Sequence, residues 1–258
     1  MNKFIGLLLL LLPLVVCAQT PEERGLEIAL EADKRDAGFG DLSSNMVMTL
    51  KNANGDTSIR KMRSKALEVV GDGDKSLTIF DKPADVKGTA FLSFTHILEA
   101  DDQWLYLPAL KRVKRISSKN KSGPFMGSEF AFEDLSSVEV AKYAYRYVKD
   151  DVLDGEDCFV IETTPKYQYS GYTRSLVWMS KDKYQPLKVE FYDRKKALLK
   201  TLMVSGYKQY LGKYWRPDVL TMVNHQTKKE TVLTFSDYAF QTGLTDRDFN
   251  KASLKRIK

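Results

Sequence analysis

The stretch NMVMTLKNANG, residues 45–55, decides the fold class because its apolar side chains repeat with a period of two. Met46, Met48 and Leu50 share one side of an extended chain, and the residues between them share the other. Asn54-Gly55, which closes the stretch, is a strong signal for a tight hairpin turn. The pattern predicts a β-strand that turns back into an antiparallel neighbour.

Similar stretches follow at short intervals along the rest of the chain. No linker rich in Pro, Gly or Ser separates them, and no repeat of fixed period is present. About eleven strands in one uninterrupted series predict a single, mainly β domain with one large antiparallel sheet, curled or closed. The expected strands are residues 58–70, 76–80, 89–94, 103–107, 142–152, 158–164, 173–180, 186–193, 198–211, 214–224 and 230–240.

One expected strand in the C-terminal half has a single apolar face. Leu187, Val189 and Phe191 point one way in this strand. The residues between them, which include Lys188 and Glu190, point the other way. We therefore expect a charge introduced at Phe191 to cost more stability than one introduced at Glu190.

The expected strand at residues 158–164 is apolar on both faces, with Phe159 and Ile161 opposite Cys158 and Val160. A sheet of this kind needs cover on both faces, or it lines a cavity. Helices packed across the sheet would satisfy the pattern, and so would a hydrophobic pocket for an acyl chain. The periodicity by itself favours the packed helices.

The chain begins like an exported protein. Lys3 is followed by an apolar run over residues 4–16, which is short for a membrane span, and the chain turns polar at Gln19. Val16 and Ala18 occupy the −3 and −1 positions of a cleavage site before Gln19. Residues 1–18 are therefore predicted to be a secretory signal peptide, and residues 19–258 a single mature domain located in the periplasm.

Cys17 offers a second interpretation, as the acylated residue of a lipoprotein signal. The residue before such a cysteine should be small, and Val16 is bulky, so simple cleavage is favoured. Cleavage would leave Cys158 as the sole cysteine, which excludes an intramolecular disulfide. After the signal, no segment reaches the roughly 18 continuous apolar residues of a membrane span.

A helix is expected to open the mature chain. Thr20-Pro21-Glu22-Glu23 is a capping box with proline at the first helical position. Leu26, Ala29 and Leu30 follow at helical spacing and share its apolar side. Gly38 provides a stop signal.

The segment 111–121 contains six basic residues and no acidic one. Lys111, Arg112, Lys114 and Arg115 are candidates for docking anionic head groups or an acidic partner. The alternative is an edge strand whose charges only protect it from pairing with other chains. The whole chain has a net charge of +6, which suits anionic lipid or nucleic acid, but a signal peptide argues against nucleic acid.

An apolar loop follows the basic segment. Phe125, Met126, Phe130 and Phe132 cluster there between glycines. Such a loop either belongs to the core or acts as a lid that opens onto lipid, and the flanking glycines allow that motion. The candidates for a lipid cavity or its lid are Phe125, Met126, Phe130, Phe132, Phe159, Ile161 and Phe191.

Signals for catalysis or metal binding are weak. His96 and His225 lie far apart in the sequence, and neither belongs to a metal-ligand motif. Cys158 lies beside Phe159 in a strand, as a small core residue would. We expect both histidines to be structural or surface residues, and we expect no enzyme activity, no metal and no cofactor.

Three carboxylates, Glu129, Glu133 and Asp134, form the one cluster that could serve acid–base chemistry. Capping of a short helix over residues 132–138, or pairing with the basic strand, is the more ordinary role for such a cluster. We expect one of these two roles.

Five short motifs occur in order, and their combination is specific although each alone is weak. They are LPALKRVKRI at 107–116, GSEF at 127–130, EDL at 133–135, PLKVEFYD at 186–193 and FSDY at 235–238. Together they resemble the family of outer-membrane lipoprotein-sorting proteins related to the periplasmic carrier LolA. The resemblance extends over residues 24–258.

The resemblance implies an unclosed β-barrel, in which helices cover the concave side of a curved antiparallel sheet and enclose an apolar cavity. It implies a carrier that moves the acyl chains of a lipoprotein or lipid between the inner and outer membranes, and we expect it to be a monomer. Members of this branch are often associated with lipid-exporting pumps of the RND type. An inner-membrane transporter and an outer-membrane acceptor are therefore the expected partners. The alternative is an adaptor or sensor that docks on such a pump without carrying cargo.

Overall fold

The computed structural model describes residues 19–256. The predicted signal peptide at residues 1–18, with Cys17, lies outside the described residues, so its cleavage and the acylation of Cys17 stay predictions. Within the described part of the chain, no helix has both the length and the apolar character that crossing a membrane requires.

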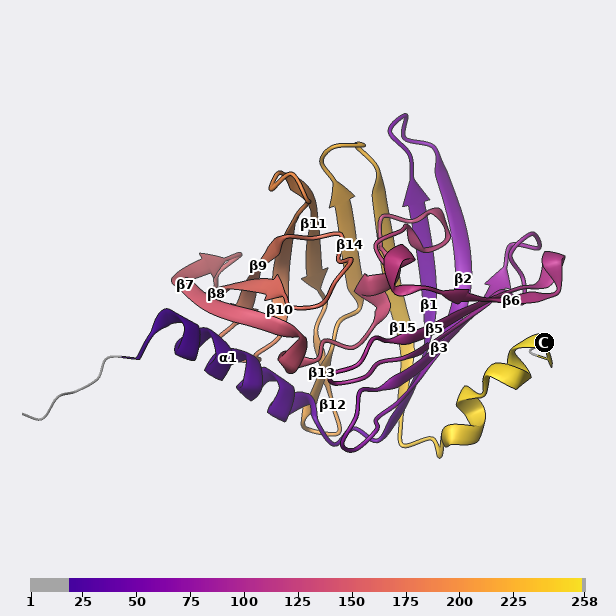
Figure 1. Ribbon diagram of the computed structural model, residues 1–258, viewed down its shortest axis with the longest axis horizontal. Coiled ribbons are helices and arrows are strands. Elements are labelled where there is room, and N and C mark those ends of the chain that lie inside the picture. The colour runs from indigo at the N-terminus through magenta and orange to yellow at the C-terminus, as the bar shows by residue number, and fades with distance from the viewer. Residues whose placement is uncertain (1–18, 257–258) are drawn as a thin grey trace, which may run out of the picture.

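A single antiparallel sheet of 13 strands forms the body of the molecule (Figure 1). The strand order is β6-β5-β4-β3-β2-β1-β15-β14-β11-β10-β9-β8-β7, so β6 and β7 are free edges and the sheet does not close. The bounds are β1 (Asp41–Lys51), β2 (Thr57–Leu67), β3 (Lys75–Lys82), β4 (Ala90–Phe94), β5 (Asp102–Leu107), β6 (Arg112–Ile116), β7 (Tyr143–Leu153), β8 (Glu156–Pro165), β9 (Arg174–Ser180), β10 (Pro186–Tyr192), β11 (Leu198–Ser205), β14 (Val219–Asn224) and β15 (Glu230–Phe240).

The predicted fold class, a mainly β protein with a large unclosed antiparallel sheet, is confirmed. Residues 45–55 form the expected hairpin, in which Met46 lies opposite Met62 and Gly55 turns the chain with a φ of +93°. The chain enters the sheet at β1 and returns beside it at β15, so this pair joins the two halves.

Two expected strands are each divided in the structure. Residues 198–211 contain β11 and β12 (Lys208–Tyr210), and residues 214–224 contain β13 (Tyr214–Arg216) and β14. The short strands β12 and β13 pair only with each other. The first break falls at Gly206, whose φ is +71° and where an added Cβ would lie 2.9 Å from the Cβ of Asp218. A side chain would therefore strain the bend.

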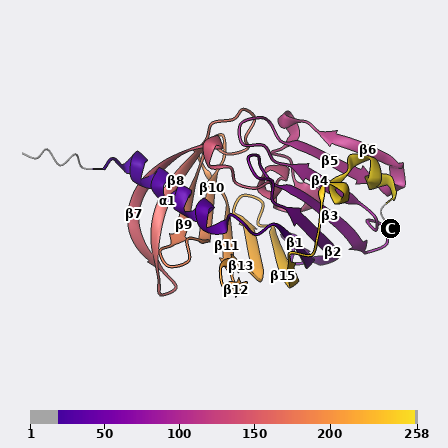
Figure 2. The same cartoon turned by 90° about the horizontal axis from the view of Figure 1, so that it is seen from below.

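The first helix, α1 (Pro21–Asp36), begins as predicted. The Thr20 hydroxyl accepts a hydrogen bond from the Glu23 backbone N–H at 3.2 Å, and the Thr20 N–H donates to the Glu23 carboxylate at 2.8 Å. Figure 2 shows the helix lying along the β7–β8 end of the sheet.

The apolar side expected for α1 is confirmed only at Ala29 and is wrong for the two leucines. Leu26 and Leu30 are 42% and 50% exposed, whereas Ile28 and Ala29 are buried. The helix turns its Gly25 side to β7, where an added Cβ would lie 2.7 Å from the Tyr147 nitrogen. The absence of a side chain at Gly25 lets the helix backbone approach the strand, and this contact selects the buried side.

An apolar cluster, hereafter the concave cluster, fills the middle of the concave face. It joins strands that lie far apart in the sheet, from Ile116 on β6 to Met222 on β14. The segment between β6 and β7 closes over it with 3-10 turns, η3 (Phe125–Gly127) and η4 (Phe132–Leu135). Helix α1 covers the concave side only at the β7–β8 end. The segment also contains the 3-10 turns η2 (Ser118–Asn120) and η5 (Val140–Lys142), and a further turn, η1 (Pro108–Leu110), connects β5 to β6.

Strands β3 to β5 are buried on both faces, as their apolar composition requires. Phe91 belongs to the concave cluster, while Leu92 and Trp104 belong to a cluster on the opposite face. Phe249 and Leu254, each 1% exposed, cover that face from the C-terminal turns η6 (Asp246–Phe249) and η7 (Lys251–Arg256). Figure 1 shows this C-terminal segment beside β3 and β6.

The expected alternation in β10 holds except at Leu187. The pairing with β9 shifts between Pro186 and Lys188. Because of this bulge, Leu187 packs with Val160 and Trp178 on the convex face, and not on the side of Phe191, which packs at the rim of the concave cluster. A bulge places two successive side chains on one face, which a strict period of two does not anticipate.

The assignment of the α1 faces can be tested with two alanine variants. Ile28→Ala should lower the free energy of unfolding by about 2–4 kcal/mol because it empties a buried site between helix and sheet. Leu30→Ala should change it by less than about 0.5 kcal/mol because Leu30 is half exposed. Urea unfolding of both variants gives the comparison, and equal losses would contradict the assignment.

Candidate functional site

Residues 124–135, hereafter the plug, occupy the concave face. Phe125, Phe130 and Phe132 are 1%, 2% and 9% exposed. The Phe125 ring lies 5.9 Å from that of Phe80 and 5.2 Å from that of Phe91, both on the sheet. The apolar loop predicted as either core or lid is therefore packed as core in this conformation.

The plug holds its own shape by a tight turn. The Phe125 N–H donates to the Phe130 carbonyl at 2.7 Å, and the Ser128 hydroxyl donates to the Phe125 carbonyl at 2.7 Å. Met126 and Gly127 between them have φ values of +50° and +78°. Met126 lies at the edge of the concave cluster, and its carbonyl accepts a hydrogen bond from the Arg60 guanidinium on β2.

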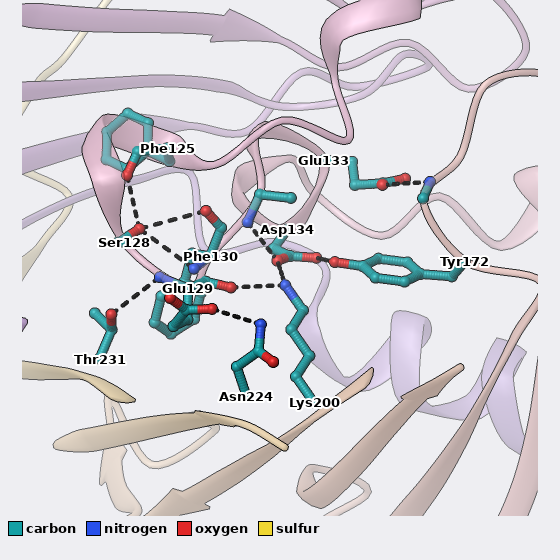
Figure 3. A network of polar contacts seen from close by, with 12 residues as sticks. Phe125, Ser128, Glu129, Phe130, Glu133, Asp134, Tyr172, Lys200, Asn224 and Thr231 are labelled. Atoms are coloured by element: carbon teal, nitrogen blue, oxygen red, sulfur yellow. Dashed lines mark hydrogen bonds and ion pairs between the residues drawn. The ribbon is translucent and has the colours of Figure 1, made fainter. Parts of the chain in front are cut away.

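A buried ion pair anchors the plug to the sheet. The Lys200 ammonium on β11 donates to the Asp134 carboxylate at 2.6 Å and to the Glu129 carbonyl at 2.8 Å (Figure 3). The side chains of Lys200 and Asp134 are only 4% and 7% exposed. Asp134 also accepts hydrogen bonds from the Ala131 N–H at 2.7 Å and the Tyr172 hydroxyl at 2.8 Å, so its charge is well satisfied.

Glu129 adds two contacts to the same face of the sheet. Its carboxylate accepts a hydrogen bond from the Asn224 amide on β14 at 2.7 Å, and its backbone N–H donates to the Thr231 hydroxyl on β15 at 3.0 Å. With Lys200, the plug is thus tied by polar bonds to three adjacent strands of the concave face, β11, β14 and β15. Such a satisfied network specifies one arrangement of the segment.

Glu133 links the plug to the loop before β9. It accepts hydrogen bonds from the Gly171 N–H at 2.8 Å, the Ser170 hydroxyl at 2.9 Å and the Tyr167 hydroxyl at 3.2 Å. Burial raises the pKa of the Glu133 carboxyl above its usual range, and the Gly171 N–H opposes that rise. Burial also raises the pKa of the Tyr172 hydroxyl, which keeps it a donor toward Asp134.

The roles expected of the carboxylate cluster are partly confirmed. Asp134 caps the short 3-10 helix η4 through the Ala131 N–H. Pairing with the basic strand is wrong, because the cation that meets Asp134 is Lys200. The sequence does contain a signal for this residue: Lys200 shares its side of the strand with Leu202 and Val204, and a lone charge on an apolar strand face needs a buried partner.

A groove with a volume of about 520 Å³ opens between the plug and strands β5 and β6. Its apolar residues are Leu105, Leu107, Ile116, Pro124 and Phe132. Lys114 and Lys119 also line it, so the groove combines an apolar lining with positive charge. This combination suits an amphiphile with an acyl chain and an anionic end.

The predicted cavity residues fall into two groups. Phe125, Met126, Phe130, Phe132 and Phe191 belong to the concave cluster or pack against it. A separate cluster beneath α1 contains the other two residues, Phe159 and Ile161.

The four predicted docking residues do not share one face. Arg112 lies opposite Leu107, and Lys114 opposite Leu105, which faces the concave cluster. Arg115 lies opposite Trp104 on the other face and forms an ion pair with Asp102. Lys111 precedes β6 with a φ of +48°.

The histidines and the cysteine have ordinary structural partners. His96 Nδ1 lies 2.7 Å from the Asp72 carboxylate, and His225 Nε2 lies 2.7 Å from the Thr201 hydroxyl. Cys158 is fully buried, as expected for a core residue. Across residues 19–256, no group of three or more His, Cys, Asp or Glu side chains could hold a metal ion.

Comparison with known proteins places this arrangement among related folds. A family model described as an uncharacterized protein matches residues 72–256. A solved domain from Vibrio parahaemolyticus, assigned to the outer membrane lipoprotein-sorting proteins, is 62% identical, with 91% of this chain and 100% of that chain covered and a TM-score of 0.90. No curated protein matched.

Two further solved structures are similar over most of the chain. A DUF1329 family protein from Desulfovibrio piger is 30% identical, with 92% of this chain and 100% of that chain covered and a TM-score of 0.87. A LolA superfamily protein from Nitrosomonas europaea is 23% identical, with 91% and 99% covered and a TM-score of 0.70. The likeness to the Nitrosomonas europaea protein shows the fold alone.

The plug anchor can be tested by removing its cation. Lys200→Met should lower the free energy of unfolding by about 3–5 kcal/mol, because Asp134 is left as a buried charge without its ionic partner. The double variant Lys200→Met/Asp134→Asn should recover part of this loss. The control is Lys208→Met, which breaks an ion pair with Asp218 in which the lysine is 64% exposed, and it should lower the free energy of unfolding far less. Equal urea midpoints for Lys200→Met and Lys208→Met would contradict the role of the anchor.

Proposed function

This chain belongs to the family of outer membrane lipoprotein-sorting proteins, and we propose that it is a periplasmic carrier of acyl chains. It binds the chains of a lipoprotein or lipid on the concave face of its sheet and transfers them between the inner and outer membranes. The predicted signal peptide supports export to the periplasm. Its expected partners are an inner-membrane transporter of the RND type and an outer-membrane acceptor.

The observation that carries this proposal is the way the concave face is covered. An apolar surface from β6 to β14 is closed by the plug, whose phenylalanines pack on the sheet and whose polar side chains bind β11 and β14. Acyl chains that replaced these rings would be removed from water at about 25 cal/mol per Å². The apolar groove beside the plug supports a route by which acyl chains enter the concave face at the β6 edge of the sheet.

Binding of a whole acyl chain requires the plug to move. In this proposal the empty protein has the closed conformation, in which Phe125 packs on the sheet. Cargo binds an open conformation in which the plug has moved off the sheet. The polar anchor through Lys200 and Asp134 sets the free energy of that opening, and cargo must bind the open state better than the closed one. Release follows when a receptor binds the cargo more tightly.

A second candidate function is a non-carrying adaptor or sensor that docks on an export pump. The observation in its favour is the free edge at β6, where Arg112, Lys114 and Arg115 are exposed. A basic strand at a free edge can meet an anionic surface or pair with an acidic segment. The two functions are distinguished by whether lipid co-purifies with the protein from its own periplasm.

The carrier proposal predicts that loosening the plug strengthens lipid binding. Tyr172→Phe removes one hydrogen bond to Asp134, so it should favour the open state by about 1 kcal/mol and raise the affinity for a fluorescent fatty acid by up to about fivefold. The matched control is Tyr147→Phe, which removes an exposed hydrogen bond to Asp150 at the β7 edge and should leave the affinity unchanged. Fluorescence titration of both variants provides the measurement. If the wild type does not bind the fatty acid, the carrier proposal is rejected. If Tyr172→Phe binds the fatty acid more weakly than the wild type does, the anchor does not control the opening of the plug.

Docking through the basic strand can be tested separately on the two faces of β6. If the strand docks on anionic membrane, Arg112→Gln/Lys114→Gln and Lys111→Gln/Arg115→Gln should each weaken co-sedimentation with anionic liposomes at low salt. Unfolding midpoints should hardly change, because exposed charges contribute little stability. If both variants bind liposomes and the pump as the wild type does, the charges serve only as edge protection.

A further inference from the structure

A second, smaller pocket lies beside the groove, on the other side of the η2 turn. It has a volume of about 220 Å³. Ile116 lines both spaces, so the pocket and the groove are neighbours at the end of β6. The pocket is smaller than ordinary sites for drug-sized ligands, but it has room for a compact polar group.

Two lysines with little exposed surface line this pocket. The side chains of Lys121 and Lys142 are 13% and 9% exposed, and both pair with one carboxylate, that of Asp101. Lys142 makes the close contact, whereas the Lys121 ammonium lies 3.8 Å from the nearer Asp101 oxygen. Two ammonium groups thus share one carboxylate in the pocket wall, and Lys121 is the less well paired.

Beyond Asp101, Lys121 has only weaker partners within contact distance in the described part of the chain, although Glu99 also lines the pocket. Its ammonium lies 3.7 Å from the centre of the Tyr167 ring, which is a weaker partner than a carboxylate. The Glu133 carboxylate also attracts the Lys121 ammonium electrostatically from farther away, but it already accepts hydrogen bonds from three donors. Burial lowers the pKa of Lys121, and the Asp101 carboxylate opposes that shift.

We propose that this pocket binds the anionic head group of the carried lipid, through Lys121, while its acyl chain lies in the adjoining groove. The inference rests on the proposed carrier function and narrows the cargo to amphiphiles with a phosphate or carboxylate next to the chain. The chemistry is a charge-assisted hydrogen bond from a largely desolvated ammonium, which is about twice as strong as a neutral one. Ser118 and Gln168, which also line the pocket, supply neutral polar groups for the rest of the head group.

The test uses the whole mature protein, stripped of lipid, and three probes. A fluorescent fatty acid and a fatty alcohol with the same chain and fluorophore differ only in the anionic group, and glycerol 3-phosphate carries an anion without a chain. The wild type should bind the acid about tenfold more tightly than the alcohol. It should also bind glycerol 3-phosphate with millimolar affinity in a calorimetric titration.

Variants of Lys121 assign the preference to the pocket. Lys121→Met should remove both the tenfold preference and the binding of glycerol 3-phosphate, while the affinity for the alcohol stays within twofold. Lys121→Arg keeps the charge and should keep the preference. The matched control, Lys87→Met, removes an exposed lysine that lines neither space and should leave all three affinities unchanged.

The outcomes separate this inference from the carrier function. Equal affinity of the wild type for acid and alcohol, or an equal loss of both in Lys121→Met, overturns the head-group pocket and leaves the carrier intact. If neither amphiphile binds, the carrier fails. In that case glycerol 3-phosphate alone tests whether the pocket binds anions. Binding that depends on Lys121 supports a site for free phosphate esters, and a lack of binding overturns the anion site.

Discussion

Lys200 places an ammonium group on the apolar, concave face of the sheet, and the arrangement of the site depends on how that charge is neutralised. Its nitrogen lies 2.6 Å from the Asp134 carboxylate, and both side chains are almost fully buried. A buried charge without its partner costs several kcal/mol, so the segment that carries Asp134 is held on the sheet. Phe125 and Phe132 come with it and fill the space above β3 and β4.

This mode of closure matters for the function that we propose. A helix that covered the face through a continuous apolar stripe would be costly to lift, since all of its contacts would be lost at once. The plug instead combines a few phenylalanines with polar bonds to β11, β14 and β15. In the proposed open state an acyl chain takes the place of the phenylalanines, and the polar bonds set the free energy that this opening costs. The groove beside the plug and the lysine-lined pocket extend the same surface toward the free edge at β6.

The strands and their order of appearance could be predicted because a period of two is a local property of the chain. The same reasoning failed where one contact overrides the period. Leu187 changes face at a bulge, and Leu26 and Leu30 are exposed because Gly25 allows the helix to turn a different side to β7. The partner of Asp134 was missed for a related reason, since the nearest cations in sequence are not the nearest in space.

The spacing of apolar residues along the chain predicted a large antiparallel sheet with apolar residues on both faces, and the motifs in the central segment indicated the family. These are properties of neighbouring residues and of their spacing. Only the tertiary structure decided which residues meet across the concave face. Lys200 and Asp134 are separated by 66 positions, and Lys121 and Lys142 meet at Asp101 only after β5 and the loop beyond β6 have folded together. Such contacts depend on the curvature of the sheet, which no local pattern specifies.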